Sequence, residues 1–275
     1  MVVAVDLGGT NIRAGLVENG RLLKNSETRL KDKDILQSTL NQLSGLIKSV
    51  MEPGVKGIGI GVPSVVDISK GIVYDVTNIS SWKKVELKSI LEKQFAIPVM
   101  VNNDVNCFIL GEHRFGLGRG YASIVGLAMG TGLGGGIIIN NELYAGNNCG
   151  AGEFGLVSYL DENIEAYCSG GFFEKKCNTT ALEAFNQASA GDHAALERWQ
   201  EFGNHLGNAI KTVVYTYDPE VVILGGSLVK ASRFFMKAMN VSMNEFAFPE
   251  SIKKLKVFIS QDENITLLGA SSLLQ

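Results

Sequence analysis

Two glycine-containing hairpins constrain the fold of this chain more than any other feature of its sequence. Residues 124–140 read IVGLAMGTGLGGGIIIN. An apolar run, a glycine-rich turn and a second apolar run predict two buried strands joined by that turn. Residues 2–17, VVAVDLGGTNIRAGLV, repeat this design with Gly8 and Gly9 in the turn. The repeat predicts a chain of two related halves, each with its own hairpin.

The composition of the two turns suits them to bind phosphate. Glycine permits positive φ and lets a ligand approach the backbone, whose N–H groups can converge on an anion. Thr10 and Thr131 add a hydroxyl donor to the turns. Either turn alone could be an ordinary hairpin with glycines for backbone reasons. Two matching turns that both contain glycine and threonine favour phosphate binding.

Length and charge exclude several classes of protein. A chain of 275 residues suits one large or two medium domains, and a hydrophobic content of 45% is enough for a core. The formal net charge is −3, and no run of Lys or Arg exceeds two residues, which argues against extended contact with nucleic acid. No apolar run approaches ~18 residues, and Met1 leads directly into a strand. We therefore expect a cytoplasmic protein that does not bind membranes.

The cysteines and histidines do not predict a metal site. The cysteines are scattered, without a CxxC pair or a histidine at ligand spacing, and buried reduced thiols are the favoured interpretation. The histidines lie in polar or helix-like contexts, and we assign them no chemistry. These residues are Cys107, Cys149, Cys168 and Cys177, and His113, His193 and His205.

Apolar periodicity and turn residues predict alternating strands and helices along the rest of the chain. Gly116 to Tyr121 is the clearest linker between the halves. In the first half we expect strands at 21–29, 55–62 and 99–101 and helices at 33–51, 85–95 and 105–115. In the second half we expect helices at 164–176, 180–190, 192–217, 228–246 and 265–274, with Asp192 as the cap of the third, and strands at 221–224 and 255–259.

The strongest catalytic candidate is Asp104, where a buried strand gives way to a helix. A carboxylate there could simply cap the helix. The two hairpins favour a catalytic role, because phosphoryl transfer needs held phosphates, an aligned acceptor hydroxyl and a base. Asp6 could reach a water on Mg²⁺, Asn103 could position the acceptor, and residues 221–227 could receive the nucleoside.

Five motifs, in this order and spanning nearly the whole chain, resemble those of the ROK family of sugar kinases and sugar-responsive repressors. Each glycine motif alone is weak, but the set is highly specific. The motifs are DLGGTN (6–11), NNDVNC (102–107), MGTGLGGGI (129–137), AGEFG (151–155) and VILGGS (222–227).

The resemblance implies an α/β fold of the actin-like, hexokinase-type ATPase class, with two βββαβα lobes around an interdomain cleft. The expected N-terminal lobe is 1–116, with the C-terminal helix 262–275 packing back on it. The larger C-terminal lobe is then 117–261. The resemblance also implies a homodimer, with ATP and Mg²⁺ as cofactors.

The resemblance also implies roles for individual residues. Asp104 matches the base that accepts the proton of the sugar 6-hydroxyl. Four residues match sugar ligands, and each has a plainer alternative: Asn78 as a turn residue, Asn103 as a helix cap, Glu153 as a surface charge and Glu165 as a solvated helix start. The expected nucleotide site comprises Asp6, Gly8, Gly9, Thr10, Asn11, Gly130, Thr131, Gly132, Gly225 and Gly226.

Two departures from the family pattern bear on metal and substrate. ROK proteins usually follow the glutamate loop with Gly-His and a cysteine cluster that together hold a structural zinc. Here Leu156 occupies the histidine position, and the segment from Glu153 to Glu165 is shorter than usual and contains no cysteine. We therefore expect no structural zinc and an altered contact near the anomeric end of the sugar. Ser64 stands where the family often has Gly.

The first hypothesis is an ATP-dependent kinase that phosphorylates a hexose or hexosamine at the 6-hydroxyl. A sugar-responsive repressor is disfavoured, because no helix-turn-helix precedes the strand at Val2. A sugar-binding relative without turnover is the remaining alternative, although a sensor would need no base at Asp104. The sequence does not distinguish glucose from fructose, mannose, allose or an N-acetylated sugar.

Overall fold

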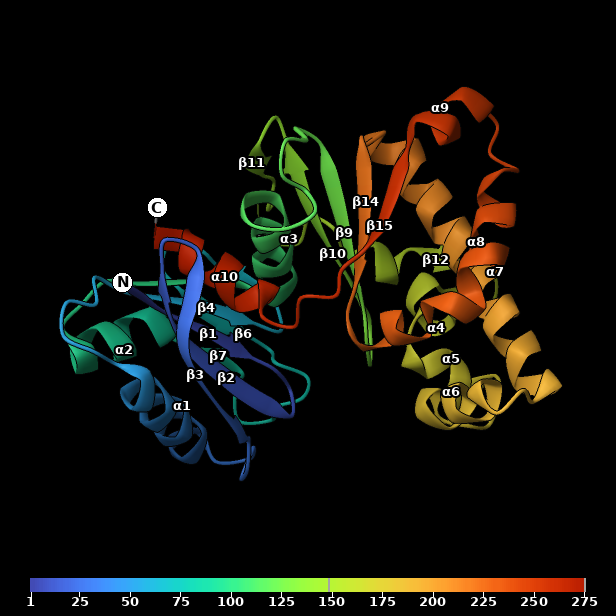
Figure 1. Ribbon diagram of the computed structural model, residues 1–275. Coiled ribbons are helices and arrows are strands. Elements are labelled where there is room, and N and C mark those ends of the chain that lie inside the picture. The colour runs from blue at the N-terminus through green and yellow to red at the C-terminus, as the bar shows by residue number, and fades with distance from the viewer. Residues whose placement is uncertain (148, 275) are drawn as a thin grey trace. The chain divides into compact units, whose positions relative to one another are not determined.

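Each half of the chain forms a five-stranded sheet, and both sheets have the same strand order. The computed structural model describes residues 1–147 and 149–274. The first sheet has the order β3-β2-β1-β4-β8 and the second β11-β10-β9-β14-β15 (Figure 1). In each sheet the glycine hairpin is antiparallel, and its first strand pairs in parallel with the next long strand of that sheet. The shared order is the internal repeat that the two hairpins predict.

The first sheet is covered by helices on both faces (Figure 1). Ile58 and Ile60 of β4 lie in one buried apolar cluster with Leu43 of α1 and Leu91 of α2. The opposite face of the sheet carries α3 and α10. The strands are β1 (Val2–Leu7), β2 (Asn11–Glu18), β3 (Arg21–Arg29), β4 (Ile58–Val62) and β8 (Val99–Asn103), with a small sheet of β5 (Val66–Asp67), β6 (Ile72–Tyr74) and β7 (Lys84–Val85). The helices are α1 (Leu36–Val50), α2 (Leu87–Phe95), α3 (Asp104–Arg114), α10 (Ile265–Ser271) and the 3-10 turn η3 (Ser272–Leu274).

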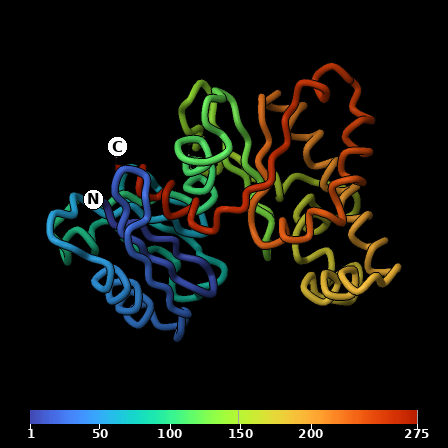
Figure 2. The backbone as a smooth tube through the Cα atoms, viewed as in Figure 1, coloured from blue at the N-terminus to red at the C-terminus, as the bar shows by residue number. Residues whose placement is uncertain are grey.

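The C-terminal helix α10 returns to the first sheet, where the red end of the chain lies beside the blue strands (Figure 2). Glycines allow this packing at backbone distance. A Cβ on Gly59 of β4 would lie 1.9 Å from the carbonyl oxygen of Ala270, and one on Gly269 would lie 1.7 Å from that of Cys107 in α3. The backbones of β4, α3 and α10 are therefore in direct contact.

The second sheet packs with a set of helices in which α7 and α8 make the most extensive contact. Gly203 and Gly207 of α7 face the carbonyl oxygens of Phe235 and Met239 in α8, with no room for a side chain. The strands are β9 (Ile124–Met129), β10 (Leu133–Ile139), β11 (Glu142–Leu143), β14 (Val221–Gly225) and β15 (Lys256–Ile259), with a hairpin of β12 (Ser158–Tyr159) and β13 (Glu162–Asn163). The helices are η1 (Phe154–Leu156), α4 (Ile164–Cys168), α5 (Gly170–Lys175), α6 (Ala181–Ser189), α7 (His193–Tyr217), η2 (Ser227–Ala231), α8 (Ser232–Met243) and α9 (Pro249–Lys254).

Two predicted helices differ from the observed ones, and capping explains the first difference. The predicted helix 164–176 is interrupted at Ser169, whose Oγ accepts a hydrogen bond from Gly171 N at 3.1 Å and caps α5. The predicted helix 228–246 begins with the 3-10 turn η2. The predicted cap Asp192 does start α7, accepting from Ala195 N at 2.8 Å. No helix within 1–147 and 149–274 has both the length and the apolar character needed to span a membrane.

Contacts between residues divide the protein into two units, whose bounds differ from those expected at residues 117–119 and at Leu143–Ala151. The first unit is Met1–Arg119, Leu143–Ala151 and Asp262–Gln275, and the second is Gly120–Glu142 and Gly152–Gln261. The segment Leu143–Ala151 was expected in the C-terminal lobe. In the first unit, Cys149 of this segment hydrogen-bonds to residues of β8 and α3, with Sγ 3.4 Å from Asn102 Oδ1 and 3.5 Å from Asn106 Nδ2.

We expect Gly269→Ala and Gly45→Ala to change stability in opposite directions. Gly269→Ala forces apart the backbones of α10 and α3, and overpacking of this kind costs ~1–3 kcal/mol or more. Gly45 lies in the exposed interior of α1 with no atom within 4 Å of an added Cβ, so Ala should stabilise the helix by about 0.5–1 kcal/mol. Thermal unfolding of both variants measures the signs. A Gly269→Ala protein as stable as the wild type would contradict the packing described for α10.

Candidate active site

The first sheet brings Asp6 and Asp104 to the same edge. β1, β4 and β8 run parallel, and Asp6 pairs in register with Gly61, which pairs with Asn102. Because neighbouring strands lie ~4.8 Å apart, the backbones at Asp6 and Asn102 are roughly 10 Å apart. Asp104 follows β8 directly as the first residue of α3. Both carboxylates therefore stand where the parallel strands end.

Asn103, rather than Asp104, caps helix α3. Its Oδ1 accepts hydrogen bonds from Val105 N at 2.8 Å and Asn106 N at 3.2 Å, while its Nδ2 donates to Ser64 O at 3.3 Å. Asp104 occupies the first helical position, where the positive end of the helix dipole favours a negative charge. Asp104 Oδ1 also accepts from Val105 N at 2.9 Å, but Asn103 supplies a bond to this amide and to that of Asn106, so the helix has a cap without Asp104.

The buried thiol of Cys107 lies near both carboxylates. Burial, followed by the negative charges of Asp104 and Asp6 and the neighbouring Cys149, raises the pKa of Cys107 well above its ordinary value. A Cβ on Gly61 would lie 3.2 Å from both the Cα of Asp104 and the Sγ of Cys107. Cys107 thus stays an un-ionised core residue, and both carboxylates act on one region of the protein.

The first glycine turn holds its own shape and leaves two amides available. Gly8 N donates to Asn11 O at 2.9 Å, and Asn11 Nδ2 donates to Glu27 Oε1 at 2.7 Å. The predicted site residues Gly8 and Asn11 thus have internal partners. Among the residues that the structure describes, the N–H groups of Gly9 and Thr10 have no backbone acceptor. They are the donors that an anion can use.

Arg13 is a site residue that our sequence reasoning missed. Its Nη2 lies 2.7 Å from Asp6 Oδ2 and its Nε 3.3 Å from the same oxygen, while Nη1 donates to Glu263 O at 2.5 Å. Asp6 and Arg13 are directly opposite in the β1–β2 ladder. The register of the predicted hairpin therefore carried the signal for this ion pair.

Asn78 lies against the first turn, as a site residue should. A Cβ on Gly9 would lie 2.6 Å from the Cβ of Asn78, so only glycine lets the two segments meet. The loop between β6 and β7 that contains Asn78 is anchored by buried Ile79 and by Trp82, whose Nε1 donates to Thr39 Oγ1 at 2.7 Å. The structure thus brings the predicted residues Gly9 and Asn78 together.

The second glycine turn is supported by Glu165. Glu165 Oε2 accepts a hydrogen bond from Leu133 N at 2.9 Å, and a Cβ on Gly132 would lie 2.5 Å from the same oxygen. Gly130 N closes the turn on Gly132 O at 2.9 Å. Within the described residues, the N–H groups of Thr131 and Gly132 have no backbone acceptor. This turn therefore offers an amide pair like that of the first turn.

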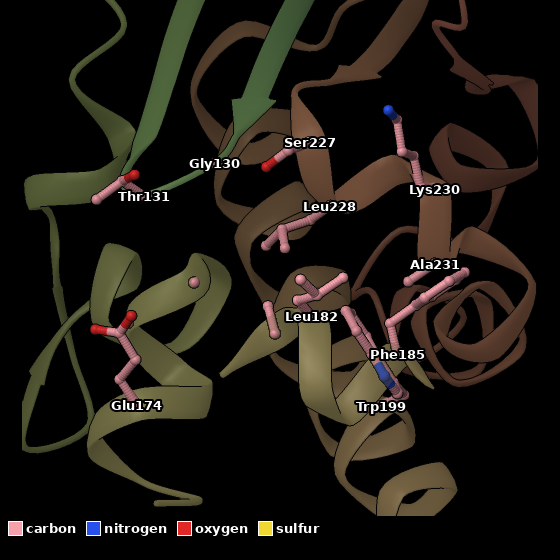
Figure 3. Close-up of a pocket in the computed structure, with 13 residues that line it drawn as sticks. Gly130, Thr131, Glu174, Leu182, Phe185, Trp199, Ser227, Leu228, Lys230 and Ala231 are labelled. Atoms are coloured by element: carbon pink, nitrogen blue, oxygen red, sulfur yellow. The ribbon is translucent and has the colours of Figure 1, made fainter. Parts of the chain in front are cut away.

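A largely apolar pocket of about 420 Å³ adjoins the second turn (Figure 3). Its volume falls in the range of ligand sites, ~300–1,000 Å³. Gly226 follows β14 and has φ of 85°, and a Cβ on it would lie 2.2 Å from Met129 O. The end of β14 therefore lies directly beside β9. Helices α5, α6 and α7 supply residues that sequence reasoning missed, since no motif marks them. The lining comprises Gly130, Thr131, Gly170, Gly171, Glu174, Ala181, Leu182, Phe185, Trp199, Ser227, Leu228, Lys230 and Ala231.

Comparison with known proteins assigns the family. The model described as ROK family matches residues 2–275. The chain belongs to the ROK family. It is 28% identical to a glucokinase of Thermotoga maritima, over 100% of this chain and 97% of that protein. It is also 27% identical to the xylose repressor of Bacillus subtilis, over 98% of this chain and 73% of that protein.

The solved structures confirm the predicted fold class. A ROK family glucokinase from Streptomyces griseus, in complex with glucose and AMPPNP, superposes with a TM-score of 0.86 at 26% identity, covering 99% of this chain and 98% of that one. The fold is the actin-like, hexokinase-type ATPase fold, in agreement with the repeated strand order of the two sheets.

Two acidic residues of this ROK chain influence one another in the second unit. Partial desolvation of the Glu153 carboxyl, together with the negative charge of Glu165, raises the pKa of Glu153 above its ordinary value. Glu153 precedes η1, and Glu165 lies in the first turn of α4. The structure therefore brings these two predicted sugar ligands close enough to interact.

We expect Glu153→Gln to raise thermal stability at neutral pH and to leave it unchanged in acid. A carboxyl whose pKa is raised on folding destabilises the folded state when ionised; the cost is present above the folded-state pKa and absent below the unfolded one. The melting temperature should rise by roughly 1–2 °C at pH 7.5, and the difference should vanish near pH 4. Glu142→Gln on exposed β11 is the control. A rise in melting temperature that persists at pH 4 would contradict ionisation of Glu153 as its cause.

Leu156 and the residues after it form the segment where ROK proteins usually carry zinc. The Leu156 side chain is 64% exposed. The hairpin of β12 and β13 follows. Its Asp161 Oδ2 and Glu162 Oε1 lie 3.0 Å and 2.9 Å from Lys176 Nζ, and Asp161 also accepts a hydrogen bond from the Tyr167 hydroxyl. Among the described residues, no group of three or more His, Cys, Asp or Glu is placed to hold a metal. Ion pairs to Lys176 connect this hairpin to the end of α5, and the Tyr167 hydroxyl connects it to α4.

We expect chelation to leave the melting temperature unchanged and purified protein to contain no stoichiometric zinc. A structural zinc supplies folding free energy, so a zinc-dependent relative would unfold more easily after chelation. Differential scanning fluorimetry with and without EDTA, beside elemental analysis, provides the measurement. One zinc per chain would require Cys149, Cys168 and Cys177 to be re-examined as ligands.

Proposed function

We propose that this protein transfers the terminal phosphoryl group of ATP to the 6-hydroxyl of a hexose or hexosamine. The observation that carries the proposal is the position of Asp104, the first residue of α3, at the same sheet edge as Asp6 and with Asn103 serving as the cap. The glucokinases among the relatives support the reaction class.

Asp104 is the general base of the proposed reaction. A sugar hydroxyl is a weak acid, so its proton must be accepted as the new oxygen–phosphorus bond forms. The rigid junction of β8 and α3 fixes the carboxylate, and the positive helix end favours its ionised form. Asp104 then holds the proton while the phosphoryl group moves to the hydroxyl oxygen and ADP leaves.

The two glycine turns and the apolar pocket bind the nucleotide in this proposal. Free amides at Gly9 and Thr10 in the first unit, and at Thr131 and Gly132 in the second, donate to phosphate oxygens. The pocket beside the second turn takes the nucleoside, with Leu182, Phe185 and Leu228 offering apolar surface to the base. Gly225 and Gly226, at the end of β14, directly precede Ser227 of the pocket lining.

The Asp6 carboxylate fits a Mg²⁺ ion that is bound through a water molecule. Arg13 donates to Oδ2 of Asp6, and Oδ1 accepts no hydrogen bond from the described residues. Mg²⁺ usually keeps several waters and binds through few carboxylates and the substrate phosphates. Asp6 would hold such a water, and the ion would neutralise charge on the phosphates when bound.

Asn78, Asn103, Glu153 and Glu165 are the proposed sugar ligands. Two of them also have structural duties: Asn103 caps α3, and Glu165 supports the second turn through Oε2. Glu165 keeps Oε1, and Asn103 keeps the second N–H of Nδ2, for a sugar hydroxyl. Leu156, exposed and without hydrogen-bonding groups, removes a polar contact near the anomeric end in this proposal.

Repression and sugar binding without turnover are the competing functions in this family, because the relatives include a xylose repressor. Asp104 and the paired amides favour catalysis, since a sensor needs no base. The proposal also includes a cytoplasmic location, expected from the sequence, and a homodimer, expected from family resemblance. Light scattering that finds a monomer at micromolar concentration would contradict the expected homodimer.

The test is ADP release from ATP and Mg²⁺ across a hexose and hexosamine panel, for wild type and Asp104→Asn. Asn keeps the size of the side chain but accepts no proton, so kcat should fall ~10²–10⁴-fold while the affinities for sugar and ATP change little. Asp192→Asn is the matched control, because Asn caps α7 about as well as Asp.

Two outcomes would contradict the proposal. An Asp104→Asn enzyme that keeps more than about a tenth of wild-type kcat excludes Asp104 as the base. Wild-type protein that binds ATP and sugar but releases no ADP above background with any sugar belongs to the non-catalytic alternative.

A further inference from the structure

A lysine from the loop between β3 and α1 contacts the first glycine turn. Lys33 is half-buried, and its Nζ donates a hydrogen bond to the carbonyl oxygen of Gly9. Its own carbonyl accepts hydrogen bonds from Ser81 N at 3.1 Å and Ser81 Oγ at 2.7 Å. Both ends of Lys33 are therefore held, the backbone by the Asn78 loop and the side chain by the turn.

The neighbours of Lys33 are the residues that would surround a phosphate. Asn78 packs on Gly9, and the unpaired amides of Gly9 and Thr10 belong to the same turn. An ammonium group has three N–H donors, and the Gly9 carbonyl takes only one of them. Lys33 thus keeps donors for further oxygens beside two amides that lack acceptors within the described residues.

Arg13, a second cation near this turn, already has other partners. Arg13 pairs with Asp6 at 2.7 Å and donates to Glu263 O. In the second unit, a carboxylate rather than a cation touches the turn backbone, because Glu165 Oε2 accepts from Leu133 N. Lys33 thus places a cationic side chain in direct hydrogen-bonding contact with the backbone of the first glycine turn.

We propose that Lys33 Nζ binds the phosphoryl group in transfer and stabilises its charge in the transition state. This inference rests on the proposed kinase function. In that reaction a bond forms between the sugar oxygen and the terminal phosphorus, the bond from that phosphorus to the bridging oxygen of ADP breaks, and Asp104 takes the hydroxyl proton. Lys33 keeps its own proton throughout and donates to the non-bridging oxygens, on which much of the negative charge lies.

The experiment compares Lys33→Met, Lys33→Arg and Lys31→Met by steady-state kinetics and by binding of ADP with and without aluminium fluoride. Lys31 is exposed and two residues away, and it hydrogen-bonds to Gln42 through its backbone N and O, so it is the matched control. We expect Lys33→Met to lower kcat ~10²–10³-fold, the size of effect that follows loss of one charge-stabilising donor. Sugar KM and ADP affinity should change little, and the tightening of ADP binding by aluminium fluoride and sugar should be lost.

Lys33→Arg should recover part of the lost kcat, and Lys31→Met should match the wild type. If Lys33 merely pins the turn to the Asn78 loop, Lys33→Met will lower the melting temperature and raise sugar KM with kcat held, which overturns the proposal. Lys33→Met that keeps more than a third of wild-type kcat also overturns it. Wild-type protein without turnover and without aluminium fluoride-dependent ADP binding would instead refute the kinase function, and this inference with it.

Discussion

Backbone-to-backbone packing around β4 is the constraint on which the first unit depends. A Cβ on Gly61 would lie 3.2 Å from the Cα of Asp104, and one on Gly59 would lie 1.9 Å from Ala270 O. Because β4 presents only glycine on this face, α3 and α10 can rest on the sheet at backbone distance. The carboxylate of Asp104 is thereby positioned by the sheet itself, which is more rigid than a loop.

The repeated sheet topology explains why the candidate site residues of both units lie in glycine turns and at the starts of helices. Parallel strands end at one edge, so whatever follows them is gathered there. In the first unit that edge collects Asp6 and Asp104, which follow the register of β1, β4 and β8. In the second unit the end of β14 at Gly226 lies against β9, next to the turn that contains Thr131.

The two departures from the ROK pattern have different physical consequences. Ser64 has φ of 151°, outside the regions that a side chain favours, which accounts for the glycine common in the family. Such a conformation costs ~1–3 kcal/mol, and the contacts of Ser64 oppose that cost: its Oγ donates to Tyr74 O at 2.5 Å and its carbonyl accepts from Asn103. Leu156 has no such internal role, because its side chain is mostly exposed.

The amino-acid sequence by itself determined the hairpins, the bounds of β3, the Asp192 cap and the strand-to-helix junction at Asp104. These features depend on local patterns of apolar residues, glycine and capping side chains, which act over a few residues. The family motifs added the fold class and the residues of the proposed site, and hairpin register would have revealed the Arg13–Asp6 pair.

Only the tertiary structure decided which residues meet across long stretches of chain. It assigned the α3 cap to Asn103, joined Leu143–Ala151 to the first unit, placed Glu165 behind the second turn and brought Lys33 to Gly9. It also built the apolar pocket from α5, α6 and α7. The physical reason is that such contacts depend on how whole elements pack, and packing is set by the shapes of many distant side chains together.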